Sequence, residues 1–222
     1  MTYAPVKSVR KAKSVRRGRP CDASLRLRRC EQILCTASKA FARHGFQETD
    51  VQVIAESLGI SKGTIYRYFP SKEELFLAAV KKGVQCLKER THRALNTPGD
   101  PLHRLGAATT AYLEFFELYP QLVELFLQES VVFRGKRRPV YFEISHEARE
   151  PFRKIIQELI KSGRVRKVSV DRVMNVMGDL VYGTMFTNYL TGRTRSHQEQ
   201  AADLLDIVFH GILTEPEKKR KP

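Results

Sequence analysis

The sequence predicts an all-α protein of about nine helices, and three observations lead to this fold class. Apolar residues recur at intervals of three and four along most of the chain, which is the spacing of one helix face. Alternating apolar and polar residues, the pattern of a half-buried strand, are not found. Gly, Pro and Asn close the periodic segments and Ser or Thr opens the next ones, as helix ends require. With 222 residues and 42% apolar content, the chain can bury a substantial core.

Residues 49–75 carry the most informative pattern, two short helices joined by a tight turn. We expect Thr49 to cap the first helix, and Gln52, three residues later, to complete a capping box. Gly59 ends this helix, because glycine readily adopts the left-handed conformation found at helix C-termini. Ser61 then caps the second helix.

The second helix has few apolar residues for its length. Ile65 and Phe69 face inward at positions i and i+4, and Pro70 ends the helix. Helix, four-residue turn, helix is the geometry that places a short second helix in the major groove of DNA. An ordinary helical hairpin with a solvated polar face is the alternative. The other positions of the second helix can donate to phosphates or reach base edges: Lys62, Gly63, Thr64, Tyr66, Arg67 and Tyr68.

The segment GISKGTIYRYFPSKEELF resembles the signature of the TetR family of bacterial transcriptional regulators, and the resemblance extends over residues 27–87. It implies a DNA-binding unit of three helices, in which we expect Thr64, Tyr66 and Arg67 to read bases. Family members commonly have histidine where this chain has Tyr68, so a phosphate contact there depends on the tyrosine hydroxyl. The matching family positions imply phosphate contacts from Thr49, Ser61, Lys62, Gly63, Tyr68 and Lys72.

The chain is strongly basic, with a net charge of +15. Residues 1–29 hold ten Lys or Arg and one acid, Asp22, so they contribute +9 of this charge. A basic arm beside a helix–turn–helix is the electrostatic footprint expected on phosphates. Residues 1–22 lack apolar periodicity, which predicts a disordered arm. Within it, Arg17 and Arg19 of the RGRP sequence resemble the core of an AT-hook, which enters an A·T-rich minor groove; a flexible tail attracted to any phosphate is the alternative.

Two further helices complete the predicted DNA-binding domain, which we place at residues 23–95. The first covers residues 24–44 and ends at Gly45, after which Phe46 anchors the loop in the core. A longer helix over residues 71–95 connects this domain to the rest of the chain. At 1.5 Å per residue it spans roughly 35 Å.

The sequence NTPGDP at residues 96–101 is the clearest interruption of the helical pattern, and we place the domain boundary there. Residues 99–214 form the predicted ligand-binding and dimerisation domain, and residues 215–222 a disordered tail. Pro151 predicts a kink or a division of the helix that contains it. The expected helices of this domain cover residues 101–119, 122–135, 139–162, 173–192 and 196–212.

The last two expected helices differ from the others in containing Gly178, Gly183 and Gly211. Glycine inside a helix costs up to about 1 kcal/mol relative to alanine, and it permits close approach of a second helix. In the resembled family, the final two helices pack against their copies as a four-helix dimer interface. The resemblance therefore implies a homodimer through these helices, although the same apolar stripe suits the core of a monomer.

Aromatic residues interleaved with polar ones are frequent after residue 101. Apolar walls with a few polar groups are what a small-molecule site requires, whereas an aromatic stripe that only fills the core is the alternative. The candidate ligand contacts are Tyr112, Phe116, Phe126, His146, Phe152, Tyr182, Phe186 and Tyr189.

Several classes of protein are disfavoured by what the sequence lacks. It has no nucleophile elbow, phosphate-binding glycine loop or His pair with metal-ligand spacing, so we expect no enzyme, cofactor or metal site. It has no membrane-length apolar run and no secretory signal, which favours a cytoplasmic location. The four cysteines form no C-x-x-C pair, and we expect idle thiols. They are Cys21, Cys30, Cys35 and Cys86.

Together these patterns predict a homodimeric repressor on a pseudo-palindromic duplex DNA operator, released by a small lipophilic or aromatic ligand. The family resemblance adds control of an efflux or stress operon. Two alternatives are an architectural DNA-binding protein without an effector and a redox-responsive regulator that uses a cysteine.

Overall fold

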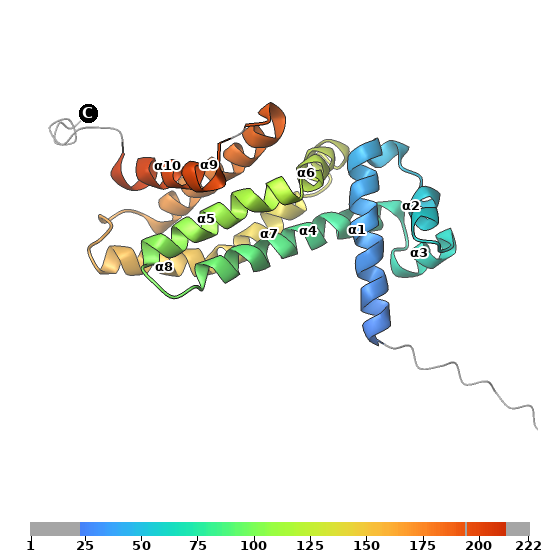
Figure 1. Ribbon diagram of the computed structural model, residues 1–222, viewed down its shortest axis with the longest axis horizontal. Coiled ribbons are helices and arrows are strands. Elements are labelled where there is room, and N and C mark those ends of the chain that lie inside the picture. Colours follow the sequence, from blue (N-terminus) through green and yellow to red (C-terminus); the bar gives the residue numbers. More distant parts are fainter. Residues whose placement is uncertain (1–22, 194, 212–222) are drawn as a thin grey trace, which may run out of the picture.

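The structure is a computed structural model, and it describes residues 23–193 and 195–211. Within these residues every regular element is a helix, so the all-α prediction is confirmed. Figure 1 shows an elongated molecule in which the first three helices form one end and the remaining helices run side by side away from it. The predicted arm at residues 1–22, with Arg17 and Arg19, and the predicted tail at residues 215–222 lie outside the described residues.

The described residues form ten helices, one more than the sequence predicts, because Pro151 divides the segment over residues 139–162. Proline lacks a backbone N–H and clashes with the carbonyl four residues earlier, and here the helix is divided into two. The N-terminal helices are α1 (Ala23–Glu48), α2 (Val51–Ser57), α3 (Lys62–Tyr68) and α4 (Lys72–Leu95). They are followed by α5 (Pro101–Leu118), α6 (Gln121–Val132), α7 (Val140–Ala148), α8 (Glu150–Lys161), α9 (Val170–Thr191) and α10 (His197–His210).

The helix α1 is interrupted where the sequence predicts its end. Gly45 has φ +80° and ψ 159°, a conformation outside the helical region that suits glycine. The chain then makes one more helical turn, in which Phe46 lies against Phe41, Phe76 and Phe133 with ring centroids 6.0, 5.2 and 5.4 Å apart. The predicted anchoring of Phe46 in the core is confirmed.

The helix α4 is the spine of the molecule, and α1, α5, α6 and α7 all pack against it (Figure 1). Its 24 residues span about 36 Å. Buried side chains occur along its whole length, from Leu75 to Leu95. Gly83 allows α6 to approach closely, since a Cβ at this position would overlap the side chain of Leu122.

Two apolar clusters make up the core. The larger one continues from α1 through α4 to α5, α6, α7 and α9, from Ile33 to Met185. The smaller one joins the far end of α4 to α5, α8 and α9 around Leu95, Leu105 and Ile156. Because α4 contributes to both clusters, a displacement of α4 affects the packing at each end of the molecule.

The last two helices begin and end largely as the sequence indicates. Gly192 adopts the left-handed conformation and ends α9. Ser196 and Glu199 form the reciprocal capping box at the start of α10. Gly211 lies beyond α10 with φ +75°, so its assignment to the interior of the last helix is wrong.

The two glycines inside α9 face different surroundings. A Cβ on Gly178 would lie 2.6 Å from Nη2 of Arg149, so the close approach at this position is to a side chain and not to a helix backbone. A Cβ on Gly183 would meet no atom of the described residues within 4 Å.

Candidate nucleic-acid interface and effector cavity

The helices α2 and α3 form a helix–turn–helix at the end of the molecule. Gly59, with φ +62°, turns the chain after α2. Ile54 and Ile65 are fully buried and hold the two helices against the core. The outer side of α3 remains uncovered within the described residues.

The residue that caps α2 is Asp50 and not Thr49, which corrects the sequence prediction. Its carboxylate accepts a hydrogen bond from the Gln52 backbone N–H at 2.8 Å. Thr49 is only 3% exposed, and its hydroxyl donates to the Gly45 carbonyl at 2.6 Å. The threonine therefore closes the loop after the α1 interruption, and its side chain does not face the surface where phosphates would lie. The Gln52 amide bonds Glu56 at 2.7 Å and forms no capping box.

The start of α3 is shaped by Ser61. Its hydroxyl accepts from the Thr64 backbone N–H at 3.1 Å and lies 2.9 Å from the Thr64 hydroxyl. A Cβ on Gly63 would meet only the Ser61 Oγ, at 3.9 Å, so the backbone here is open to close approach. Tyr66 is 37% exposed, and Arg67 is exposed beside it. The structure thus brings together five of the predicted base and phosphate contacts around the uncovered sides of α3.

Lys62 already has a partner in the free protein. Its Nζ lies 2.8 Å from the Asp50 carboxylate, and both side chains remain largely exposed. The pKa of Asp50 is lowered by the Gln52 backbone hydrogen bond and then by Lys62, and the pKa of Lys62 is raised by Asp50. A phosphate that binds Lys62 must therefore share this lysine with Asp50 or displace the carboxylate.

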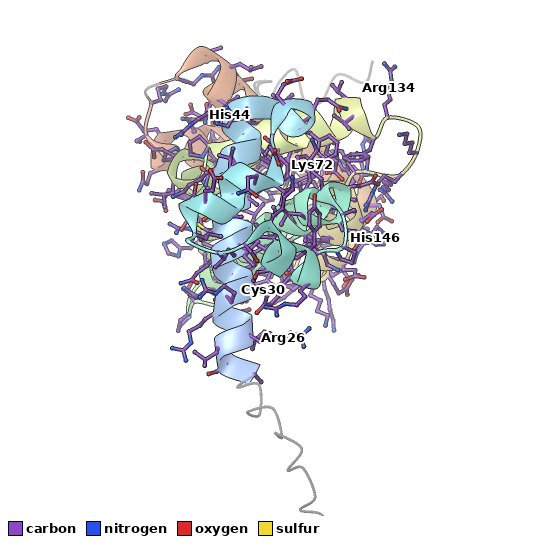
Figure 2. All side chains as sticks on the ribbon, turned by 90° about the vertical axis from the view of Figure 1, so that its right-hand side faces the viewer. Arg26, Cys30, His44, Lys72, Arg134 and His146 are labelled. Atoms are coloured by element: carbon purple, nitrogen blue, oxygen red, sulfur yellow. The ribbon has the colours of Figure 1, made fainter. Side chains whose placement is uncertain are left out.

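Lys72 makes intramolecular bonds that the sequence did not indicate. Its Nζ donates to the carbonyls of Gln47 and Thr49 at 2.8 and 3.1 Å and lies 5.0 Å from the Phe46 ring centroid. Figure 2 looks onto this end of the molecule and shows Lys72 between α1 and the start of α4. The side chain ties the end of α1 to α4, so its first role is to position the helix–turn–helix.

Tyr68 is half-buried, and the guanidinium of Arg26 lies 5.9 Å from its ring centroid. Arg26 is exposed in the first turn of α1, at the lower end of this helix in Figure 2. It was not among the predicted contacts. The basic sequence from Arg26 to Arg29 was the available signal, because such a run at the start of a helix beside Tyr68 adds positive charge next to α3.

A cavity of about 130 Å³ lies among α4, α5, α7, α8 and α9. Its walls are mainly apolar, and they include two cationic side chains, Lys88 and Arg149, and no carboxylate. Apolar walls with a few polar groups are typical of small-molecule sites. The lining residues contributed by α4 are Val84, Leu87, Lys88 and Thr91.

A pair of tyrosines provides hydroxyl groups at the cavity wall. The hydroxyls of Tyr112 and Tyr141 lie 2.8 Å apart, and both side chains are buried. Burial raises the pKa of both phenols, that of Tyr112 well above its ordinary value. Both groups therefore stay neutral at physiological pH and can donate or accept a hydrogen bond.

The predicted ligand contacts are spread over several places. Tyr112 and Phe152 line the 130 Å³ cavity. Phe116 and Tyr189 line a second, more polar depression of about 580 Å³ beside Arg193 and residues 195–198. His146 is exposed on α7 (Figure 2) and lines neither space. The other three pack into the aromatic core: Phe126, Tyr182 and Phe186.

Sequence reasoning missed Tyr141, Lys88 and Arg149 as lining residues. Lys88 lies on α4, Tyr141 on α7 and Arg149 at the corner between α7 and α8, and helical periodicity does not show which helices face one cavity. Burial raises the pKa of Tyr182 to about 12, which is consistent with its place in the packed core.

Other kinds of site find little support among the described residues. Those residues contain no cluster of His, Cys, Asp and Glu that could hold a metal ion. None of their helices is long and apolar enough to cross a membrane. Cys30 and Cys86 are half-buried, and burial raises the pKa of both thiols, which disfavours the reactive thiolate.

Comparison with known proteins gives one family. Residues 33–79 match the family model described as bacterial regulatory proteins, tetR family. The activator FasR of Mycolicibacterium smegmatis is 35% identical over 101 residues, which cover 46% of either chain, so the match spans less than half of that relative. The repressor KstR2 of the same species is 27% identical over 186 residues, covering 83% of this chain and 90% of KstR2.

Solved structures agree with this family. The ketosteroid transcriptional regulator KstR2 of Mycobacterium tuberculosis superposes with a TM-score of 0.58 at 25% identity, covering 84% of this chain and 96% of that one. FadR of Bacillus subtilis, solved with stearoyl-CoA, gives a TM-score of 0.69 at 19% identity over 82% of this chain and 99% of that one, a likeness of fold alone. Together with the exposed helix α3, these matches support the TetR family of bacterial regulatory proteins: residues 33–79 match its family model, and similarity to its DNA-binding transcriptional regulators extends over most of the chain.

Proposed function

We propose that this regulator is a homodimeric repressor that leaves its operator when a small lipophilic or aromatic molecule enters the cavity. The observation that carries the proposal is the double role of α4. Its first turn is bonded through Lys72 to the end of α1 and to the loop that leads into α2, and its middle lines the cavity from Val84 to Thr91. A ligand that moves α4 therefore moves α3.

The DNA contacts of the proposal lie on α3 and its surroundings. Thr64, Tyr66 and Arg67 are the candidates for base reading, and Ser61, Lys62, Gly63 and Tyr68 for phosphate contacts. We add Arg26, because it lies beside Tyr68 on the exposed end. A dimer presents two copies of α3 about 34–36 Å apart, which is one turn of DNA.

The dimer of the proposal forms through α9 and α10. Large apolar side chains lie exposed on these helices in the single chain, which is the expected state of a surface that a second copy covers. Gly183 leaves open space on α9, where a partner helix could approach closely. The exposed apolar residues are Val176, Leu180, Tyr189, Leu190 and Ile207.

The cavity is small enough to couple ligand binding to helix movement. Its 130 Å³ is comparable with an engineered cavity that holds one benzene molecule. A longer lipophile must displace a wall, and α7 is joined to α4 by the 2.8 Å hydrogen bond between His92 Nε2 and the Ala148 carbonyl. A complete switch from 1:99 to 99:1 requires a ligand that binds the released state about 10⁴-fold more tightly.

The names of relatives support a lipophilic effector more than a particular operon. KstR2 is named a repressor and a ketosteroid regulator, and FadR was solved with stearoyl-CoA. These names speak for genes of lipid metabolism and not for the efflux or stress operon of our first expectation. FasR is named an activator, so the sign of regulation has to be measured.

The test begins with the selection of tight-binding duplexes from a random library, followed by footprinting. Tyr66→Ala should abolish the footprint and leave helix content and dimerisation unchanged, because its ring is exposed on α3 and is not part of the core. Tyr119→Ala is the control, since Tyr119 is 44% exposed but lies at the end of α5, away from α3. An undiminished footprint with Tyr66→Ala would remove this residue from the interface.

Addition of lipophilic compounds to the same footprinting assay separates the main alternative. An architectural DNA-binding protein would protect DNA without discrete operator sites and would not respond to any compound. The redox alternative predicts that peroxide changes operator binding and that serine substitutions of Cys21, Cys30 and Cys35 abolish this response. The raised pKa of Cys30 argues against this thiol as the sensor.

A further inference from the structure

Arg149 lies at the corner between α7 and α8 and lines the cavity. Its Nη1 donates to the side-chain carbonyl of Asn175 on α9 at 3.4 Å. Its Nη2 occupies the space that a side chain at position 178 would fill, 2.6 Å from the Cβ that Gly178 lacks. The guanidinium therefore lies against α9, where Asn175 accepts its hydrogen bond and Gly178 leaves room for it.

The acids nearest to this corner are engaged elsewhere. Arg153, one helical turn further along α8, pairs with Glu150 at 3.7 Å and with Asp171 at 2.5 Å. Among the described residues, no carboxylate lies within the 4.0 Å ion-pair distance of Arg149. The corner thus holds one arginine that is neutralised and one that is not.

The wall of the cavity as a whole has an excess of positive charge. Besides Arg149, the only Lys, Arg, Asp or Glu in the wall of this cavity is Lys88, which is also cationic. The hydroxyls of Tyr112 and Tyr141 lie near enough to Arg149 for its charge to lower their pKa, although burial raises it more. An anionic oxygen that enters this space would meet positive charge and hydroxyl donors on a mainly apolar surface, where such interactions are strong.

We propose that the effector is a lipophilic anion, whose carboxylate or phosphate pairs with Arg149 and whose hydrocarbon body fills the cavity. Gly178 is a specificity-determining residue in this arrangement, because it provides the space in which the guanidinium lies. The inference rests on the proposed effector site and names the chemistry of its ligand.

The test compares a matched anion and alcohol, decanoate and 1-decanol, below their micelle concentrations and at about 0.15 M salt. Binding to the full chain is measured by isothermal titration calorimetry. Wild type should bind decanoate about 10- to 100-fold more tightly than decanol, as expected for one charge-assisted pair. Decanoyl-CoA is the third probe; if it binds more tightly than decanoate and also depends on Arg149, the anion is a carrier phosphate and not a free carboxylate.

Three variants locate the effect. Arg149→Met keeps the length of the side chain and should reduce the preference for decanoate to near unity, with decanol binding unchanged. Gly178→Ala should do the same, because the added methyl displaces only the far end of a flexible side chain and alanine favours the helix. Arg153→Met is the matched control, since Arg153 does not line the cavity, and it should retain the wild-type preference.

Equal affinity of the wild type for the two probes, or no binding of either, would overturn the inference. So would a preference for decanoate that survives Arg149→Met in a folded protein. Operator release, followed in the same samples, separates this inference from the proposed function. If decanol releases DNA as well as decanoate does, the proposal of an anionic effector is wrong and the ligand-released repressor is supported. If decanoate binds through Arg149 without releasing DNA, the anionic ligand is supported and the ligand-released repressor is wrong.

Discussion

Glu129 on α6 is a buried acid, only 2% exposed. One carboxylate oxygen accepts from the Val140 backbone N–H at 3.0 Å, at the start of α7, where Pro139 offers no side-chain cap. The other oxygen is buried and has no hydrogen-bond partner among the described residues. Burial raises the pKa of this carboxyl above its usual value of 4.5, because the charged form is poorly solvated there.

The raised pKa of Glu129 predicts a pH dependence of stability. The folded state binds the proton more tightly than the unfolded state, so this contribution to stability is present below pH 4.5 and is lost as pH rises through the folded-state pKa. Glu129→Gln keeps the acceptor for Val140 and removes the ionisation, so the free energy of unfolding should fall less with rising pH than in the wild type. Urea unfolding of both proteins from pH 4.5 to pH 8 measures this free energy. An identical pH dependence in the two proteins would contradict the raised pKa of Glu129.

Thr49 yields a second prediction at the residue scale. Thr49→Val removes the hydroxyl that donates to the Gly45 carbonyl and should cost about 1–2 kcal/mol of unfolding free energy. Operator affinity at fixed salt should not change, because the side chain is buried. A loss of operator affinity of about tenfold in the folded variant would instead return Thr49 to the DNA interface.

The element scale shows most clearly what a sequence can and cannot predict. Caps that depend on neighbours in the chain were predictable, such as the Ser196–Glu199 box and the end of α9 at Gly192. The start of α2 was not, because Thr49 and Asp50 are both good caps and the choice depends on how Thr49 meets Gly45 across the loop. Pro151 marked a break, although only the structure shows that two separate helices result.

The approach of α4 and α6 gives a prediction at this scale. Gly83→Ala should force α6 away from α4 or displace Leu122, and it should destabilise the fold by about 1–3 kcal/mol through overpacking. Gly106→Ala, on α5, is the control within a helix, because its Cβ would lie 3.4 Å from the side chain of Leu205, an ordinary contact distance, and it should cost nothing or stabilise slightly. Thermal unfolding of the two variants side by side makes the comparison; equal midpoints would show that the contact between α4 and α6 yields without cost.

At the scale of the whole molecule, the sequence predicts the DNA-binding domain and an apolar regulatory domain, but not how the helices around α4 form the cavity between them. The helix–turn–helix was legible because its exposed polar residues lie close together in sequence. The cavity was not, since its wall comes from five helices and unites residues as distant as Leu87 and Val181. Aromatic content indicated an apolar domain correctly, yet Phe126 and Phe186 fill the core, while Arg149 is a polar residue that no periodicity singled out.

The proposed dimer surface supplies the prediction at this scale. Ile207 on α10 is 50% exposed, and Ile207→Glu would place a charge in the interface. We expect monomers in sedimentation analysis and a loss of operator binding of at least about 100-fold, because two copies of α3 no longer bind together.

Val131→Glu is the control for the dimer prediction. Val131 is 76% exposed on α6, outside α9 and α10, and the substitution should leave both dimerisation and operator affinity intact. A dimer that survives Ile207→Glu would direct the search for the interface to another surface.

The division of one long helix at Pro151 has a consequence for how new effector responses arise. Pro151 is not among the residues that line the cavity, yet the corner it creates aims Arg149 inward and frees the Ala148 carbonyl for His92. A mutation that straightened this corner would swing one wall away from α9 without altering any residue that meets the ligand. The range of ligands that such a protein binds can therefore change through substitutions that alter the backbone at this corner. A search for altered responses that randomises only the lining residues would not find these substitutions.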